Sequence, residues 1–319
     1  MEYIILILGF ILLIKGADYF VDGSSSVAKL LKIPAIVIGL TVVAFGTSMP
    51  EASVSVTAAL KGQNGLAVSN VVGSNIFNLL IVLGMSALLN PIVAGKDVIK
   101  KEIPFSILTT ILLAVLCVRR NVMGGMTQME TFTLGRLDGA ILLGMFIFYV
   151  AWEVKSALSG RTEDSGEEYK TLSPIRSAIY IIGGLIAIIY GGDLVVESAT
   201  VIAENFGFDD TFIGLTVVAM GTSLPELVTS MVAAKKGENE LALGNVIGSN
   251  IFNILLILGA SSLICPITVG AVAIYDMIAL LAISIFTFVC VKTRKEISKL
   301  EGAAFLVIYV AYFVYIFNR

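Results

Sequence analysis

Long apolar runs alternate with short polar breaks along the whole chain. Windows bounded by charged residues, glycine or proline fall near residues 3–21, 35–60, 66–90, 103–118, 137–156, 175–199, 210–234, 241–265, 271–291 and 302–317. A helix that crosses a bilayer needs about 20 mostly apolar residues. The pattern therefore predicts an all-α membrane protein with ten transmembrane helices.

One stretch of the chain occurs twice. A shift of 175 residues aligns positions 15–91 with 190–266 without a gap, and 34 of the 54 positions from 38 to 91 match their counterparts. Five predicted spans, an odd number, separate equivalent positions, so the second copy enters the membrane upside down. The sequence thus predicts two inverted five-helix repeats, over 1–156 (spans 1–5) and 174–319 (spans 6–10), joined by a linker over 157–173. Transporters use this design and bind substrate between the repeats.

Composition narrows the functional classes. The chain is 57% hydrophobic and only 14% charged, with a mean hydropathy of +0.95, which excludes an ordinary soluble domain. The net charge of -3 offers no basic face for nucleic acid. Because the chain contains no histidine, and its three cysteines lack metal-ligand spacing, most catalytic acid-base arrangements and transition-metal sites are also excluded.

The distribution of basic residues predicts an orientation. If the spans alternate, 15 of the 21 lysines and arginines fall in the odd-numbered loops, five fall on the opposite side, and Lys15 lies within the first span. Loops rich in lysine and arginine stay in the cytoplasm. We therefore expect a multi-pass protein of the cell membrane with a cytoplasmic linker and both termini extracellular. The expected surroundings are the lipid bilayer, with no nucleic acid and no obligatory protein partner.

Two glutamates carry the chemistry of the repeat. Glu51 is the only charged residue from Ile36 to Leu60, and Glu226 is the only one from Thr211 to Ala234. The spans that follow, near 66–90 and 241–265, have no charge in their apolar interiors. A carboxylate buried at mid-membrane costs roughly 2.5–3.5 kcal/mol on insertion scales. Protons or cations from water must therefore neutralise the two glutamates, and a facing pair of carboxylates matches one divalent cation in charge.

The residues around each glutamate supply more oxygen atoms. Pro50 and Pro225 cannot donate a backbone hydrogen bond, so each helix is expected to break there and free carbonyl groups. Many hard oxygen ligands favour Ca²⁺ over Mg²⁺, and Na⁺ can share them. The further candidates on the same predicted helix faces are Ala44, Ser48, Ser74 and Asn78, with their counterparts Ala219, Ser223, Ser249 and Asn253. Taken singly, each polar residue among them has an equally good structural explanation, such as a bond to the preceding helical turn.

The duplicated motifs resemble those of a known family. GTSMPE at 46–51 and GSNIFN at 73–78, with their copies at 221–226 and 248–253, resemble the two alpha-repeats of the sodium/calcium exchangers, in the calcium/cation antiporter superfamily, and most closely the short prokaryotic forms. The resemblance implies ten helices, with spans two, three, seven and eight as a central core. It also implies that spans one and six slide across this core to expose it to each side in turn.

The resemblance also implies a role for each candidate. Glu51 and Glu226, with the carbonyl groups of Thr47 and Thr222, would hold Ca²⁺. Na⁺ would bind around them, at sites supplied by Ala44, Ser48, Ser74, Asn78, Ala219, Ser223, Ser249 and Asn253. The implied function is antiport of Na⁺ and Ca²⁺, with no cofactor beyond the transported ions. Potassium-dependent members carry aspartate where this chain has Asn253, so potassium coupling is not expected here.

Three other functions are compatible with parts of this pattern. A proton/calcium exchanger would use the same glutamate pair, but that branch of the superfamily typically carries a histidine-containing acidic motif that this chain lacks. An intramembrane enzyme could use paired carboxylates as acid and base, yet the sequence has no HExxH motif, no phosphate-binding loop and no base beside the glutamates. A passive channel would need rings of ligands supplied by oligomeric symmetry. The sequence therefore favours a non-enzymatic antiporter.

Overall fold

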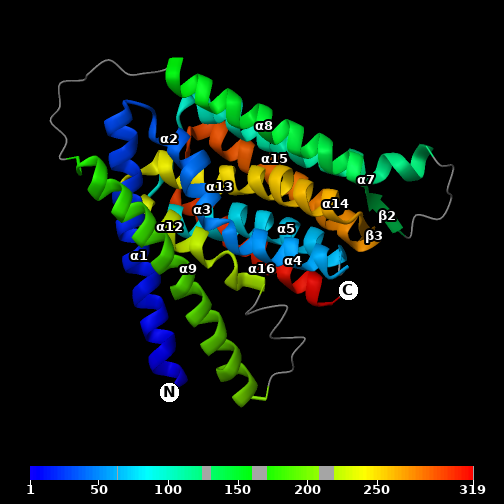
Figure 1. Ribbon diagram of the computed structural model, residues 1–319, viewed down its shortest axis with the longest axis horizontal. Coiled ribbons are helices and arrows are strands. Elements are labelled where there is room, and N and C mark those ends of the chain that lie inside the picture. The colour runs from blue at the N-terminus through cyan, green and yellow to red at the C-terminus, as the bar shows by residue number, and fades with distance from the viewer. Residues whose placement is uncertain (63, 124–130, 160–170, 208–218, 319) are drawn as a thin grey trace.

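The described part of the protein is mostly helical, with four short strands (Figure 1). The computed structural model describes residues 1–62, 64–123, 131–159, 171–207 and 219–318. Within these ranges, eight helices are long and apolar enough to cross a membrane, and a bent pair of helices raises the number to nine. The span expected near 210–234 lies partly outside the described residues, so a total of ten remains a prediction.

The described part of the first half contains eleven helical segments and two strands. They are α1 (Glu2–Leu31), α2 (Ala35–Ile38), the π-helical η1 (Gly39–Val43), α3 (Ala44–Thr47), α4 (Met49–Leu60), α5 (Asn64–Phe77), the π-helical η2 (Asn78–Val82), α6 (Leu83–Leu89), β1 (Ile92–Val93), the π-helical η3 (Val98–Glu102), α7 (Ile103–Met123), β2 (Thr131–Leu134) and α8 (Arg136–Ser159). Helix α8 therefore runs to Ser159, into the stretch expected to be linker.

The described part of the second half follows the same order. It contains α9 (Pro174–Asn205), α11 (Ala219–Gly221), α12 (Leu224–Lys235), α13 (Asn239–Phe252), the π-helical η5 (Asn253–Leu258), α14 (Gly259–Ile264), β3 (Ile267–Gly270), α15 (Ala271–Arg294), β4 (Glu296–Ile297) and α16 (Lys299–Phe317). The segments η2 and η5 begin at Asn78 and Asn253, which are equivalent positions of the repeat. Local π-helical turns often occur at functional sites.

Burial separates central from peripheral helices. In the apolar 18-residue window of the continuous span Asn239–Ile264, formed by α13, η5 and α14, 94% of the residues are buried within the protein, whereas only 11% are buried in that of Lys299–Phe317. Figure 1 shows α13 and α5 in the middle of the bundle, with α7, α8 and α15 along one side. The central helices therefore have protein neighbours on all sides, and the outer helices leave apolar side chains for lipid.

Small residues bring α1 and α9 into close contact. A Cβ atom placed on Gly16 would lie 2.8 Å from the carbonyl oxygen of Gly184, and one on Gly191 would lie 2.7 Å from the backbone nitrogen of Leu13. Small residues at regular spacing let membrane helices pack backbone against backbone. In Figure 1 the two long helices run side by side and extend together beyond the rest of the bundle.

Two short antiparallel strand pairs connect the halves of the chain. β1 pairs with β4 through Ile92 and Ile297, and β2 pairs with β3 from Thr131 opposite Gly270 to Leu134 opposite Ile267. β1 and β3 occupy equivalent places, directly after the two copies of the repeated sequence. Each pair joins a strand that follows one copy of the repeat to a strand that precedes the last helix of the other half. The two pairs are therefore related by the internal repeat.

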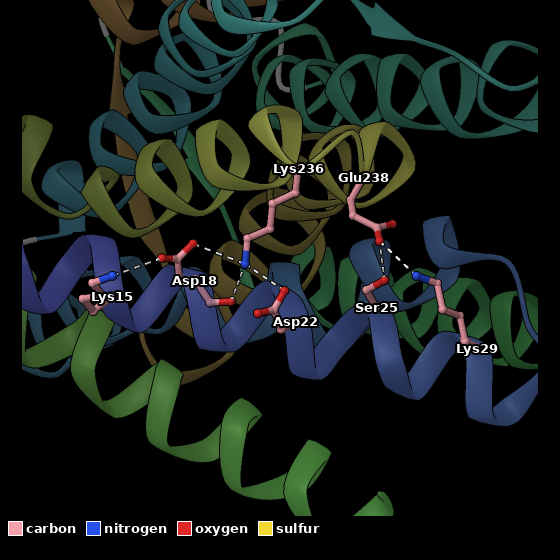
Figure 2. A network of polar contacts seen from close by, with 7 residues as sticks. All are labelled: Lys15, Asp18, Asp22, Ser25, Lys29, Lys236 and Glu238. Atoms are coloured by element: carbon pink, nitrogen blue, oxygen red, sulfur yellow. Dashed lines mark hydrogen bonds and ion pairs between the residues drawn. The ribbon is translucent and has the colours of Figure 1, made fainter. Parts of the chain in front are cut away.

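A polar network joins α1 to the end of α12 (Figure 2). The Nζ atom of Lys236 lies 2.7 Å from Asp22 Oδ1 and 3.2 Å from Asp18 Oδ1. One turn further along, Glu238 Oε1 accepts hydrogen bonds from Ser25 at 2.5 Å and from Lys29 at 3.2 Å. These groups are partly exposed, so each ion pair is worth about 1 kcal/mol or less.

The Lys236→Gln substitution tests the strength of this network. We expect it to lower the free energy of unfolding by about 1 kcal/mol or less at low salt, because partly exposed ion pairs are weak. The loss should disappear at about 1 M salt, where screening acts within about 3 Å. Thermal unfolding at both salt concentrations measures the effect. The control is Lys61→Gln at the equivalent position of the first copy, where the described residues show no ion pair; an equal loss there would contradict the assignment.

Candidate cation site

Both copies of the repeated motif break a helix just before the glutamate. In the first copy α3 ends at Thr47, Ser48 takes the non-helical angles φ -82° and ψ 8°, and the two helical parts of the span meet at 50°. In the second copy Ser223, with φ -92° and ψ 5°, precedes α12. The break predicted from the prolines is therefore confirmed. Each proline lies in the first turn of the new helix, where its missing N–H costs nothing.

The glutamates lie in the first turns of α4 and α12, and each points toward the other copy. Ser48 donates a hydrogen bond of 2.9 Å to Glu226 Oε1, and Ser223 donates one of 2.9 Å to Glu51 Oε1. Both carboxylates are fully buried, with exposed fractions of 0%. Because the contacts are reciprocal, the two predicted glutamates and the two predicted serines form one cluster at the centre of the protein.

The following spans complete the cluster in the same symmetric way. Ser74 donates to Glu51 Oε1 and Ser249 donates to Glu226 Oε1, both at 3.4 Å. The Oγ atoms of Ser223 and Ser74 also lie 3.1 Å apart. The serines predicted from the repeat therefore surround the carboxylates from both halves of the chain.

Several buried oxygen atoms in the cluster have no hydrogen-bond donor among the described residues. They are Oε2 of Glu51 and of Glu226 and Oδ1 of Asn78 and of Asn253. The described part of the chain also shows no lysine or arginine paired with either carboxylate. An uncompensated buried charge costs several kcal/mol, and unsatisfied buried oxygens cost about 1–3 kcal/mol each. Cations supplied from outside the chain would satisfy these oxygen atoms.

The two asparagines are held in place by a second pair that the sequence reasoning missed. Asn78 Nδ2 donates to Asn250 Oδ1 at 3.1 Å, and Asn253 Nδ2 donates to Asn75 Oδ1 at 2.9 Å. In turn, Asn75 Nδ2 donates to the carbonyl oxygen of Asn250 at 3.1 Å. This arrangement uses the amide nitrogens of Asn78 and Asn253 and leaves their buried oxygens without a donor among the described residues. Asn75 and Asn250 lie inside the duplicated GSNIFN motif, so their identity in both copies was the available signal.

A third pair of asparagines steadies the helices that carry the glutamates. Asn70 Nδ2 donates to Ser55 Oγ at 3.0 Å and to the carbonyl oxygen of Glu51 at 3.4 Å. The equivalent Asn245 makes the equivalent bonds to Ser230, at 2.9 Å, and to the carbonyl oxygen of Glu226, at 3.3 Å. These residues too were identical in both copies, but nothing in a single sequence separated their bracing role from packing.

The remaining predicted residues lie at the breaks. Thr47 is buried, and its hydroxyl donates to Asn245 Oδ1 at 2.9 Å. Thr222 follows α11 at the matching position of the second break. Ala44 is fully buried at the start of α3. Ala219 begins α11, but its side chain lies outside the described part of the structure.

A cavity of about 480 Å³ reaches the second break. Met49 and Pro50 line it from the first break, and Thr222 and Pro225 line it from the second. Asp193 and Glu197 on α9 also line this cavity, and both are exposed to solvent. The cavity therefore lies against residues of both helix breaks.

Comparisons with known proteins identify relatives of this chain. The sequence profile of the family described as sodium/calcium exchanger protein matches residues 1–155 and 176–318. The putative antiporter CaxA of Alkalimonas amylolytica is 39% identical, with 99% of this chain and 98% of that protein covered. The sodium/calcium exchanger MaX1 of Methanosarcina acetivorans is 35% identical over 99% of this chain and 98% of its own length.

The fold agrees as well. A crystal structure of the sodium-calcium exchanger NCX_Mj, soaked with 10 mM Na⁺ and zero Ca²⁺, superposes with a TM-score of 0.83 at 35% identity, and covers 97% of both chains. Family, relatives and fold therefore agree over almost the whole chain. The chain belongs to the sodium/calcium exchanger protein family of the calcium/cation antiporter superfamily.

Proposed function

We propose that the protein is a secondary active antiporter that exchanges Na⁺ for Ca²⁺ across the membrane by alternating access. One observation carries the proposal: two fully buried carboxylates from the two copies of the repeat meet at the centre, and each keeps one oxygen without a donor among the described residues. Membership of the exchanger family supports cation antiport. The ions are substrates, and no cofactor, nucleic acid or obligatory protein partner enters the proposal.

The site assignment divides the cluster between the two ions. Glu51 and Glu226, with the carbonyl groups of Thr47 and Thr222, bind Ca²⁺. The Na⁺ ions bind through the surrounding residues Ala44, Ser48, Ser74, Asn78, Ala219, Ser223, Ser249 and Asn253. The unpartnered oxygens of Asn78 and Asn253 support their place in this set. Because the Na⁺ sites surround the two glutamates, Na⁺ and Ca²⁺ compete for the charge of Glu51 and Glu226.

Competition between Na⁺ and Ca²⁺ for one site explains how their movements across the membrane are coupled. A buried pair of bare carboxylates penalises any state that closes the site from both sides of the membrane, whereas bound cations remove the penalty. A ligand moves an equilibrium between states by its difference in affinity for them. The protein therefore crosses between outward-open and inward-open states with ions bound, and an ion entering from one side is exchanged for one released on the other.

The membrane arrangement is part of the proposal. Ten helices form two inverted repeats over residues 1–156 and 174–319, with a linker over 157–173 in the cytoplasm and both termini outside the cell. The relation of the two strand pairs by the internal repeat supports this symmetry. Spans one and six, represented by α1 and α9, move together across the core because they pack backbone against backbone.

Flux measurements test the choice of coupling ion. Proteoliposomes loaded with Na⁺ and diluted into Na⁺-free medium should take up calcium-45, because outward movement of Na⁺ drives inward movement of Ca²⁺. A pH gradient without Na⁺ should drive little or no uptake. Uptake driven by the pH gradient alone would establish proton/calcium exchange through the same glutamates instead.

The Asn253→Asp substitution should change ion preference. It places a third carboxylate beside the pair, at an oxygen that has no hydrogen-bond donor among the described residues. Added negative charge favours cations more strongly, so we expect the apparent affinity for Ca²⁺ and the response to K⁺ to change by at least severalfold. Calcium-45 uptake over a range of Na⁺, K⁺ and Ca²⁺ concentrations measures this. Wild-type ion dependence in this variant would remove Asn253 from the site.

A further inference from the structure

A second cavity lies away from the central cluster, between α7 and α8. Its volume is about 260 Å³, and its lining includes Glu102 at the start of the α7 span and Glu153 near the end of the α8 span. Glu153 is five residues from the end of the span Arg136–Leu158, which is about 7.5 Å at 1.5 Å per residue. The headgroup layer on each side of a bilayer is about 5–8 Å thick. The cavity therefore lies within about the last three turns of the α8 span, near the end that approaches the headgroup layer.

The interior of this cavity is acidic and buried. Glu102 and Glu153 have exposed fractions of only 5% and 3%. Glu102 accepts a hydrogen bond of 3.4 Å from the Tyr149 hydroxyl. Glu153 has no hydrogen bond and no ion pair among the described residues, although its carboxylate lines the cavity. A buried carboxylate without a partner calls for a cation from outside the chain.

The charged groups of the described residues do not neutralise the two glutamates. Lys101 also lines the cavity, but its Nζ atom lies 3.0 Å from Asp97 Oδ1 and its side chain is 46% exposed. Lys101 therefore forms an ion pair with the exposed carboxylate of Asp97 at the rim of the cavity. The two buried glutamates therefore have no cationic partner of their own among the described residues, and the lysine marks the outer edge of the cavity.

The walls are aromatic. Phe105 stacks on Tyr149 with ring centroids 4.8 Å apart, and Phe148 lies 6.0 Å from Trp152. Phe148 and Trp152 are 58% and 51% exposed, so they form the outer side of the cavity. Aromatic faces attract organic ammonium groups and are the usual lining of ammonium-binding sites. Ca²⁺ would need six to eight oxygens, which two carboxylates and one phenol do not supply.

We propose that this cavity binds the primary ammonium headgroup of a zwitterionic membrane phospholipid of the phosphoethanolamine type. The ammonium group enters between Glu102 and Glu153 and donates its N–H groups to their carboxylates. The lipid phosphate remains at the rim beside Lys101. A quaternary ammonium has no N–H to donate, and an anionic headgroup meets the wrong charge in the interior, so the cavity discriminates among headgroups.

The chain offers a direct probe of this site. Trp152 is its only tryptophan and lines the cavity, so intrinsic fluorescence reports occupancy. The full-length protein in detergent is titrated with short-chain phosphatidylethanolamine, phosphatidylcholine or phosphatidylglycerol, and in a separate arm with free phosphoethanolamine. We expect a saturable spectral shift with phosphatidylethanolamine, at a concentration at least tenfold below that needed for the other two lipids. Free phosphoethanolamine should bind at least tenfold more weakly than the lipid.

Substitutions assign the response to the carboxylates. Glu102→Gln combined with Glu153→Gln should weaken binding of phosphatidylethanolamine at least tenfold, while Glu204→Gln, at an exposed glutamate in the last turn of α9, should leave it unchanged. An equal response to phosphatidylcholine, a response that survives in the double variant, or no saturable response overturns the proposal. Equal binding of free phosphoethanolamine overturns the assignment to a lipid.

A measurement on the wild-type protein keeps the test valid if the double variant does not fold. Native mass spectrometry of protein extracted from equal mixtures of phosphatidylethanolamine and phosphatidylcholine should show preferential retention of phosphatidylethanolamine. Retention of both lipids in equal amounts contradicts the proposal. These experiments read lipid binding and not ion flux, so their outcome is independent of the proposed Na⁺ and Ca²⁺ exchange.

Discussion

Replacing Glu51 or Glu226 with glutamine is expected to abolish Ca²⁺ uptake driven by a Na⁺ gradient, with a loss of at least a hundredfold. Glutamine keeps the shape of the side chain and can still accept the serine hydrogen bond at Oε1. It removes the charge that draws a divalent cation into the buried cluster. Calcium-45 uptake into proteoliposomes measures the loss.

The same substitutions should not unfold the protein. In the absence of cations each bare carboxylate is a burden of roughly 2.5–3.5 kcal/mol, so the glutamine variants should melt at the same temperature as the wild type or higher. Ca²⁺ should raise the melting temperature of the wild type and leave that of the variants unchanged. Glu204→Gln, far from the cluster on α9, serves as the matched control. Exchange at the wild-type rate in either glutamine variant would refute the central assignment.

The helix breaks at the site could be predicted because their cause is local. Pro50 and Pro225 lack a backbone N–H wherever they occur, and a proline inside an apolar run must end or bend a helix. The glutamates were equally visible, since a single charge in an apolar span stands out without any knowledge of the fold. In both cases the physical constraint acts within one helical turn, so one sequence is enough to reveal it.

The contacts across the repeat could not be predicted in the same way. The bond from Ser48 to Glu226 joins residues that are 178 positions apart, and the bond from Asn253 to Asn75 joins another such pair. Asn75 follows Ser74 in the sequence and looks like any polar residue in a membrane helix. The role of Asn75 depends on which helices lie beside it, and tertiary packing determines that. Duplication identified the candidates, but not their partners.

Span boundaries were predicted less well than span existence. The apolar window near 3–21 belongs to a helix that continues to Leu31, and the window near 175–199 belongs to one that continues to Asn205. Both extensions carry polar residues such as Asp22, which pairs with Lys236 outside the apolar stretch. Hydropathy measures the length that fits in a bilayer, whereas hydrogen bonding and packing continue a helix beyond it.

The contact between α1 and α9 leads to a second large effect. Gly184→Ala should lower the free energy of unfolding by about 1–3 kcal/mol, the usual cost of overpacking. The added Cβ would lie 2.7 Å from the Gly16 carbonyl oxygen and 2.7 Å from the Phe20 backbone nitrogen, neither of which can move without separating the helices. Thermal unfolding measures the loss. Exchange should slow as well, because the proposed movement requires both helices to move as one unit.

The neighbouring residue provides a control of opposite sign. Gly183 lies on the exposed side of α9, and a Cβ placed there meets no other atom within 4 Å. Gly183→Ala should therefore leave stability unchanged or raise it by up to about 1 kcal/mol, since alanine favours a helix over glycine. Two adjacent and chemically identical substitutions thus separate close packing from helix propensity. If Gly184→Ala were as stable and as active as Gly183→Ala, the two helices could not be held backbone to backbone, and their joint movement would lose its physical basis.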